Sequence, residues 1–299
     1  MVKQNVIVVA VDGSAASQTA TRWAANTALK RKEPIRLVST YSMPQFLYAE
    51  GMVPPQELYD DLEAEAMEKI DTARKIIADF DESVEVSYQV EEGNPIDMLL
   101  DISQDVTMIV MGSRGLGGFS GMVMGSVSAA VVSHAKCPVV VVREESDVST
   151  ATKYGPVVVG VDGTGVAEKA IEMAFAEASA RKAPLRAVHT WIDMQVQASL
   201  AGLNAAQKQW EEIEEDQKRL LAERVSGYKD KYPDVEVEQI ITRDRPVRAL
   251  ADASEDAQLL VVGSHGRGGF RGMLLGSTSR ALLQEAPCPL MVVRPESRV

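Results

Sequence analysis

Residues 112–126 of this 299-residue chain read GSRGLGGFSGMVMGS, and residues 263–277 read GSHGRGGFRGMLLGS. Each copy follows an apolar run and precedes a polar helix start. Such a density of glycine weakens regular structure, because glycine loses more backbone freedom on folding than any other residue. Both stretches therefore predict a long loop between a strand and a helix, where the backbone turns tightly or approaches a ligand closely.

The two stretches belong to a longer internal repeat. Residues 111–142 align with residues 262–293 at a constant offset, with 17 identical pairs among 32. The beginnings of the two halves also match, since VIVVAVDGS at 6–14 answers VVVGVDGT at 157–164. The period is far longer than the roughly 20–50 residues of solenoid repeats. The sequence thus predicts two copies of one domain.

We place the two domains at residues 1–145 and 155–299. The segment between them, EESDVSTATKYG at 144–155, is polar, contains Ser and Thr, and ends before a Gly-Pro step. Such a composition is typical of a linker.

Composition and charge limit the class of protein. Hydrophobic residues make up 45% of the chain, enough to bury a core, and the net charge is −12. A nucleic-acid binder needs a basic face, so we expect no nucleic-acid partner. The start MVKQNVIVVAVDG has no apolar h-region with a cleavage site, and no run approaches the roughly 20 residues of a membrane span. We expect a cytoplasmic protein without membrane association. Cys137 and Cys288 are expected to be small buried hydrophobic residues and not a disulfide.

The order of apolar runs and helical patterns indicates the fold class. Short, nearly continuous runs such as VIVVAV and TMIVMG predict strands that are buried on both faces of a parallel sheet. Helices are predicted after Ser14, over 55–80, from Pro95, and after Ser126, and a matching long helix is predicted over 210–228. This alternation predicts an α/β fold with two tandem doubly wound parallel-sheet domains of five strands each.

Each domain has a natural place for a ligand. Ligands of such sheets bind beyond the carboxyl ends of the strands, where the strand order reverses. The VDG segment after the first strand and the glycine-rich loop after the fourth should meet there. Loop N–H groups, together with those of the first helical turn, can bind a phosphate group.

Familiar phosphate-loop fingerprints do not match. The Walker sequence GxxxxGK[ST] is absent, and the Rossmann GxGxxG fails because Ser120 stands at its third glycine position. The pattern present is Gly-x2-Gly-x9-Gly-Ser, at Gly112, Gly115, Gly125 and Ser126 and again at Gly263, Gly266, Gly276 and Ser277.

The early VDG[S/T], the late GSxGxGGFxGMxxGSxS, and the closing CP with its valine strand resemble universal stress proteins, specifically their tandem, ATP-binding class. The resemblance covers nearly the whole chain and implies domains of the universal stress protein, or adenine nucleotide α-hydrolase-like, fold. It implies a cytoplasmic stress-response sensor or regulator that binds ATP and hydrolyses it slowly at most. An ATP-using enzyme of similar architecture, which adenylylates a substrate or hydrolyses ATP, stays open as the alternative.

The resemblance also implies site residues. Asp12 and Asp162 would contact adenosine, Thr40 and Thr190 would lie beside adenine, and the glycine loops would wrap the ribose and phosphates. The first site would comprise Ala10, Asp12, Thr40, Gly112, Ser113, Arg114, Gly115, Gly117, Gly118, Gly125, Ser126 and Val127. The second would comprise Gly160, Asp162, Thr190, Gly263, Ser264, His265, Gly266, Gly268, Gly269, Gly276, Ser277 and Thr278. No carboxylate lies in either loop, so an accompanying Mg²⁺ would be held by phosphates and water, without metal ligands from the protein.

Other interpretations of these residues remain. The two aspartates could cap the following helices, and the glycines could serve only tight turns and close helix–strand packing. A valine at Gly115 or Gly266 would fill ligand space and disfavour the positive φ expected there. Ser264 and His265 could suggest a nucleophile and base, but adjacent side chains are not expected to meet, and no third group orients them. No catalytic residue is therefore expected.

The two halves also differ in charge. The second loop carries His265, Arg267 and Arg271, whereas the first carries Arg114 alone at these positions. If these side chains face phosphate, the affinity of the second site for ATP should fall more steeply as the salt concentration rises. The closing VVVVR and LMVVR strands could pair to make an intrachain pseudo-dimer, and a homodimer of whole chains is a further expectation. The downstream protein partner cannot be read from the sequence.

Overall fold

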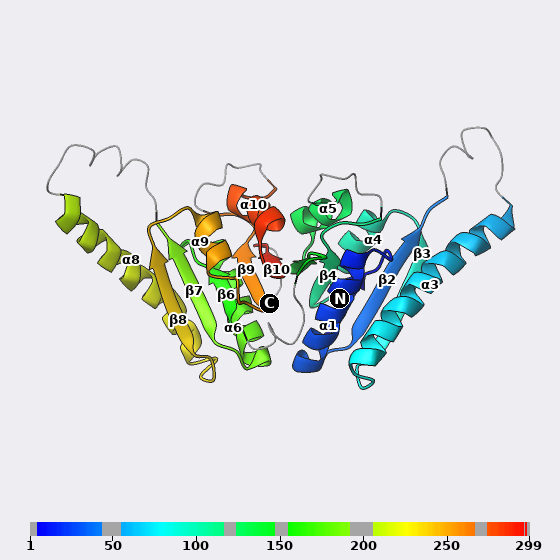
Figure 1. Ribbon diagram of the computed structural model, residues 1–299, viewed down its shortest axis with the longest axis horizontal. Helices are drawn as coiled ribbons and strands as arrows, with labels where there is room; N and C mark the ends of the chain where they lie inside the picture. Colours follow the sequence, from blue (N-terminus) through cyan, green and yellow to red (C-terminus); the bar gives the residue numbers. More distant parts are fainter. Residues whose placement is uncertain are drawn as a thin grey trace. The chain divides into compact units, whose positions relative to one another are not determined.

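The protein is described here by a computed structural model. It describes residues 5–43, 55–116, 124–146, 155–191, 206–266, 274–295 and 297. Contacts divide the chain into two compact units, described over residues 5–146 and 155–295. Each unit has strands and helices in strict alternation (Figure 1).

The first unit is a five-stranded parallel sheet. Its elements follow in the order β1 (Ile7–Ala10), α1 (Ala15–Arg31), β2 (Ile35–Tyr41), α3 (Gln56–Phe80), β3 (Val86–Glu92), α4 (Pro95–Ile102), β4 (Met108–Gly112), α5 (Ser126–His134) and β5 (Val139–Val142). The strand order is β3-β2-β1-β4-β5. Ile7 of β1 is in register with Ile35 of β2 on one side and with Met108 of β4 on the other. The order therefore reverses between β1 and β4.

The second unit repeats this plan. Its elements are β6 (Val157–Gly160), α6 (Gly165–Arg181), β7 (Leu185–Thr190), α8 (Ala206–Lys229), β8 (Val237–Thr242), α9 (Pro246–Asp252), β9 (Leu259–Gly263), α10 (Ser277–Glu285) and β10 (Leu290–Val293). The strand order is β8-β7-β6-β9-β10, with parallel pairing throughout. The predicted α/β fold, with a doubly wound five-stranded parallel sheet in each half, is confirmed.

Local sequence explains where the helices begin. Ser14 is the N-cap of α1, and its side chain accepts a hydrogen bond from the Ser17 N–H. Asn94 caps α4 in the same way, and Pro95 takes the first helical position, where a missing N–H costs nothing. The predicted helix starts at these positions are confirmed.

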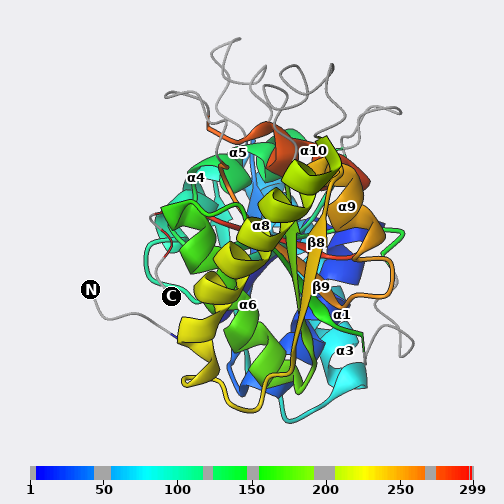
Figure 2. The same ribbon diagram turned by 90° about the vertical axis from the view of Figure 1, so that its left-hand side faces the viewer.

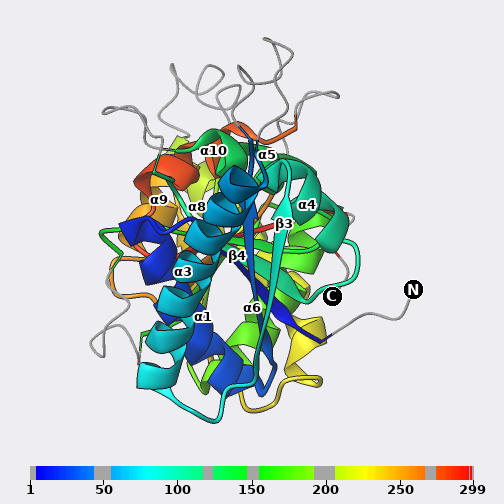
Figure 3. The same cartoon turned by 90° about the vertical axis from the view of Figure 1, so that its right-hand side faces the viewer.

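Helices cover both faces of each sheet. In the first unit α1 packs against α3 and α4 packs against α5, and in the second unit α6 packs against α8 and α9 against α10. Figure 2 shows α8 and α9 on opposite sides of β8, and Figure 3 shows α3 and α4 on opposite sides of β3. The long helices α3 and α8 therefore lie on the same face as the helices that follow the VDG segments.

The central strands supply the core. Every residue of β4 and β5 is buried, as expected for strands covered on both faces, whereas the edge strand β3 is largely exposed. Cys137 and Cys288 are both buried thiols, as expected from the sequence. Burial raises the pKa of the Cys288 thiol to about 12, which keeps it in the unreactive neutral form.

Candidate functional site

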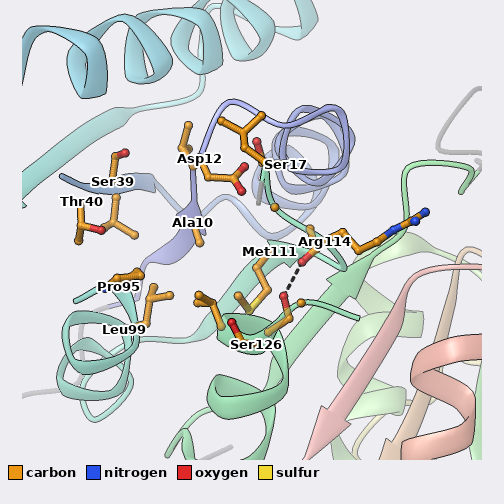
Figure 4. Close-up of a pocket in the computed structure, with 18 of the residues that line it drawn as sticks. Ala10, Asp12, Ser17, Ser39, Thr40, Pro95, Leu99, Met111, Arg114 and Ser126 are labelled. Carbon is orange, nitrogen blue, oxygen red and sulfur yellow. Dashed lines mark hydrogen bonds between the residues drawn. The ribbon is translucent and has the colours of Figure 1, made fainter. Parts of the chain in front are cut away.

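The first unit contains a cavity of about 800 Å³ where the strand order reverses. Its wall combines the carboxyl ends of β1, β2 and β4 with the first turns of α4 and α5 (Figure 4). This is the place at which open α/β sheets bind ligands. The predicted residues on this wall are Ala10, Asp12, Thr40, Gly112, Arg114, Gly115, Gly125, Ser126 and Val127.

Asp12 holds the turn that follows β1. Its Oδ1 accepts hydrogen bonds from the Ser14 N–H at 3.0 Å and from the Ser14 Oγ at 2.7 Å. The intervening Gly13 has φ +87°, a conformation that favours glycine. Ser14, and not Asp12, is the residue that caps α1, so the capping interpretation of Asp12 is wrong. Asp12 instead fixes the capping residue and leaves a second carboxylate oxygen toward the loop.

The second unit has the same turn. Asp162 Oδ1 accepts from the Thr164 N–H at 2.9 Å and from the Thr164 Oγ1 at 2.7 Å, and Thr164 caps α6. Gly163 has φ +79°. The Asp-Gly-Ser/Thr turn is therefore one local structure built twice.

Gly115 lies directly against Asp12, and Gly266 lies directly against Asp162. A Cβ built on Gly115 would lie 2.4 Å from Asp12 Oδ2, and one built on Gly266 would lie 2.6 Å from Asp162 Oδ2. Real Cβ atoms do not approach an oxygen so closely, so any other residue here would force the aspartate carboxylate, held through its Oδ1, out of its present place. The expected positive φ at Gly115 and Gly266 is wrong, because among the described glycines only Gly13, Gly93 and Gly163 have positive φ. Close approach to a carboxylate, not backbone conformation, explains these glycines.

Gly112 and Gly263 have a different reason to be glycine. A Cβ on Gly112 would meet Ala16 Cβ and the Ser17 nitrogen at 2.9 Å, at the start of α1. A Cβ on Gly263 would meet Val166 Cγ1 at 3.0 Å. At these two positions the helix–strand packing interpretation accounts for the residue, and it brings the helix start close to the end of the strand.

The two ends of each glycine-rich loop are joined by a backbone hydrogen bond. The Gly125 N–H donates to the Ser113 carbonyl at 2.8 Å, and the Gly276 N–H donates to the Ser264 carbonyl at 2.7 Å. Ser113 is itself buried and contributes to this closure instead of the cavity wall. The predicted loop residues Gly117, Gly118, Gly268 and Gly269, like Arg267 and Arg271, lie outside the described residues.

Each glycine-rich loop leads into a helix with an open N-terminus, that is, one without a side-chain cap. Gly125 is the N-cap of α5 and Gly276 is the N-cap of α10, and neither provides a capping side chain. The first-turn N–H groups, including those of Ser126 and Val127 in the first unit and Ser277 and Thr278 in the second, therefore depend on water or a ligand. Such an end favours a negatively charged group.

The opposite end of the first cavity is less polar. Ala10 ends β1 and Thr40 lies one residue before the end of β2, and Pro95 and Leu99 of α4 face them (Figure 4). Met98 of α4 also lies on this wall. In the second unit Gly160 replaces Ala10. A Cβ there would lie 3.2 Å from Leu250 Cδ1, so that leucine lies where the alanine methyl would need room. This end of the cavity suits a flat, mostly apolar group.

The carboxyl ends of β2 and β7 differ more strongly in the residue that precedes Thr40 and Thr190. Ser39 lines the first cavity, whereas His189 takes the corresponding place in β7 and is 1% exposed. His189 Nδ1 contacts the Val161 carbonyl at 2.5 Å, and Nε2 contacts Gln217 Oε1 of α8 at 2.9 Å. The histidine therefore joins β7 to α8 and to the residue that follows β6, and it is a packed residue at the end of its strand.

Two basic side chains near the sites were not predicted. Lys69 of α3 lies on the wall of the first cavity. In the second unit Arg224 of α8 donates to the Gly163 carbonyl at 3.1 Å and pairs with Glu168. Both come from long helices whose charges, read from the sequence, indicate only a solvated face. Their positions depend on how each helix packs beside the Asp-Gly turn, for which the sequence holds no local signal.

The two units also differ at the residue that follows the first serine of the glycine-rich loop, which is Arg114 in the first unit and His265 in the second. The Arg114 carbonyl accepts from Ser14 Oγ at 3.2 Å, while its guanidinium extends away from the other labelled residues in Figure 4 and pairs with Glu145 at 3.2 Å. In the second unit His265 Nδ1 lies 3.0 Å from Ser264 Oγ. The expectation that these adjacent side chains do not meet is thus wrong. Ser264 is fully buried, however, so its hydroxyl is not exposed to a substrate.

Over the described ranges, no group of three or more His, Cys, Asp or Glu side chains is placed to hold a metal ion. Among the helices with described residues, none combines the length and the apolar character needed to cross a membrane.

Comparisons with known proteins agree with the repeat. A model of the universal stress protein family matches residues 4–143 and again residues 153–294. A universal stress protein from Mycobacterium tuberculosis strain H37Rv is 39% identical over 302 residues, covering 96% of this chain and 94% of that protein. One from Mycobacterium bovis is 37% identical over 297 residues, covering 98% of each. The crystal structure of a universal stress protein from Archaeoglobus fulgidus superposes with a TM-score of 0.69 at 21% identity, covering 97% of this chain and 98% of that one.

Proposed function

The chain belongs to the universal stress protein family in both of its halves, and from this premise we propose that each half binds ATP. The observation that carries the proposal is the first cavity, in which the Asp12 turn, the ends of the glycine loop and the open N-terminus of α5 meet. A cavity of about 800 Å³ falls within the roughly 300–1,000 Å³ of small-molecule sites.

The chemistry of the wall suggests how ATP would lie. Adenine would occupy the less polar end, between Thr40 and α4. The Asp12 carboxylate would accept hydrogen bonds from the ribose hydroxyls or an adenine amine. The phosphates would take N–H groups from the loop around Gly115 and from the start of α5, where the helix dipole adds a modest attraction of about 0.3–1 kcal/mol. Mg²⁺ would bind mainly through the phosphates and water.

The second unit carries the same functional elements. Asp162, Gly266 and Gly276 are arranged as their counterparts in the first unit, and α10 begins without a side-chain cap. We therefore assign up to two ATP molecules to each chain.

We further propose that the chain acts as a cytoplasmic sensor or regulator of the stress response. In this role ATP occupancy, and not its turnover, carries the signal. The described Ser264–His265 contact does not support a nucleophile, because Ser264 is buried. The competing proposal is an ATP-using enzyme, and turnover separates the two: dedicated enzymes typically reach about 1–10³ s⁻¹. A rate in that range would overturn the regulatory role, whereas hydrolysis close to the buffer background would support it.

Assembly is a separate part of the proposal. The two halves would form an intrachain pseudo-dimer, and whole chains could pair further as homodimers. Sedimentation equilibrium of the purified chain tests the homodimer directly, since a single species of 32.4 kDa would rule it out.

The decisive experiment is direct. Freshly purified protein is denatured, and any released nucleotide is identified and counted by mass spectrometry. Nucleotide-free protein is then titrated with ATP and Mg²⁺ by calorimetry. We expect up to two ATP molecules per chain. No released nucleotide, together with no heat and no thermal shift at millimolar ATP, would refute ATP binding.

A further inference from the structure

Lys69 reaches the first cavity from a helix outside the glycine motif. It lies on the same wall as Asp12 and Gly115. Its methylene stem crosses the Asp-Gly turn: a Cβ built on Gly13 would lie 3.2 Å from Lys69 Cγ and 3.5 Å from Cδ. Gly13 therefore both makes the turn and leaves room for this stem. The helix α3 thus carries the lysine stem over the turn, with the Lys69 side chain on the cavity wall.

The present partner of this ammonium is weakly bound. Lys69 Nζ pairs with Glu65 Oε1 at 2.8 Å, one turn earlier on the same helix, and the Glu65 side chain is 61% exposed. The hydrogen bond from Lys69 lowers the pKa of the Glu65 carboxyl. Exposed pairs of this kind contribute little, because water screens them and two long side chains lose freedom. A ligand phosphate, which carries more charge, can therefore take the lysine from Glu65.

The long helix of the second unit also brings a cation to its Asp-Gly turn, from a position about one turn further along the helix than Lys69. Arg224 of α8 donates to the Gly163 carbonyl at 3.1 Å and pairs with Glu168, in the first turn of α6. One guanidinium thus bonds both the Asp-Gly turn and the helix that follows it. This arrangement bonds the cation to the Asp-Gly turn itself, whereas Lys69 pairs, among the described residues, within its own helix, with Glu65.

We propose that Lys69 is a phosphate-contacting residue of the first site, which exchanges Glu65 for the phosphate chain when the nucleotide binds. The contact gives the first unit a preference for phosphorylated ligands, whereas the cation that the described part of α8 brings to the second Asp-Gly turn is Arg224, which is bonded to that turn. This inference rests on the proposed binding of ATP and names a residue that the glycine motif does not contain.

The test uses the full chain with the second site blocked by Gly266→Val, so that binding reports on the first unit. Lys69→Met keeps the stem over Gly13 and removes the charge, whereas Lys69→Arg keeps a cation. Lys75→Met on the same helix is the matched control, since Lys75 is exposed and not on the cavity wall. ATP and adenosine are titrated into each variant, and thermal melts confirm folding.

We expect Lys69→Met to weaken ATP binding about tenfold or more, the usual scale for a hydrogen bond to a charged group, and to change adenosine binding less than about twofold. Lys69→Arg and Lys75→Met should retain the preference for ATP over adenosine. An unchanged ratio of ATP to adenosine affinity in Lys69→Met, whether both fall or neither does, would show that the lysine only packs on the turn. If the Gly266→Val parent binds neither ligand while the unmodified chain also binds none, the proposed function itself fails, and this inference with it.

Discussion

The two units share a backbone frame and differ in the side chains around it. In both units the aspartate accepts hydrogen bonds from the residue two positions later. In both, a glycine of the loop lies directly against the same aspartate. Around this frame the first unit presents Ser39 and Lys69 to its cavity, whereas the second has His189 bonded to α8. From this comparison we infer that the motif would set where a ligand binds, while helices outside the motif would set how strongly each half binds it.

The largest expected effect comes from breaking the shared frame. Gly115→Val would place a side chain 2.4 Å from Asp12 Oδ2 and should reduce ATP affinity in the first unit by about 100-fold or more, because several hydrogen bonds of about 1.5–3 kcal/mol each depend on this arrangement. Gly266→Val should do the same in the second unit alone. Photo-crosslinking with an azido derivative of ATP, followed by peptide mapping, measures each half separately.

Gly165→Ala serves as the control for these glycine variants, since a Cβ there meets nothing within 4 Å. It should bind ATP as the unmodified chain does. If Gly115→Val kept full labelling of the first half, the loop glycine would have no part in binding.

The next effect separates the two roles of the aspartate. Asp12→Ala should weaken ATP binding by about 1–3 kcal/mol and also loosen the turn at Ser14. Asp12→Asn keeps an oxygen for the Ser14 N–H, so it should retain thermal stability and still lose affinity, because the carboxylate charge is gone. Calorimetry and thermal melts on both variants provide the test. An Asn variant that binds ATP normally would reduce Asp12 to a structural residue.

Salt dependence sharpens the comparison between the sites. The second loop carries His265, Arg267 and Arg271, which predicts a steeper loss of ATP affinity with salt and a stronger preference for ATP over AMP in the second unit. In the proposed arrangement Lys69 would add a cation to the first site and reduce that difference. Lys69→Met should therefore flatten the salt dependence of the first site and widen the gap between the two.

The measurement is a titration of ATP and AMP at two salt concentrations, in chains with one site blocked. The prediction is contradicted if ATP affinity depends equally on salt in the two halves and the ratio of ATP to AMP affinity is also equal, both before and after Lys69→Met. The two sites would then not differ in their electrostatics.

The smallest expected effect concerns Arg114. Its guanidinium pairs with the exposed Glu145, which would compete with a ligand phosphate for it. Glu145→Gln should raise ATP affinity in the first unit by about 0–1 kcal/mol, the range of exposed ion pairs, and leave the second unit unchanged. A lower affinity would show that Glu145 supports the loop instead of competing with the ligand.

Much of the frame could be predicted from the sequence because its signals are local. Apolar runs indicated the strands, and Ser14 and Asn94 indicated helix starts, as each caps its helix through its own side chain. The meeting of Asp12 with the glycine loop followed from topology, since both lie at the carboxyl ends of neighbouring strands.

The remaining features depend on contacts between distant elements. Gly115 resembles a residue chosen for its φ, but its reason is the side-chain oxygen of Asp12, in the turn after a neighbouring strand. Lys69 resembles any lysine on a solvated helix, and only the packing of α3 beside α1 brings it to the cavity. The Ser264–His265 contact depends on how the loop leaves β9. The spacing of residues along the sequence does not predict these contacts.

The fit of Gly115 against Asp12 also has an evolutionary consequence. A side chain at the glycine cannot coexist with the carboxylate in its present place, so substitution of the glycine depends on whether the aspartate, far away in the chain, is kept. A duplicated half released from selection for its ligand would lose this constraint, and substitutions at both positions would record the loss. Both halves of this chain still carry the aspartate and the glycine in contact. Neither copy, by this criterion, has begun to decay.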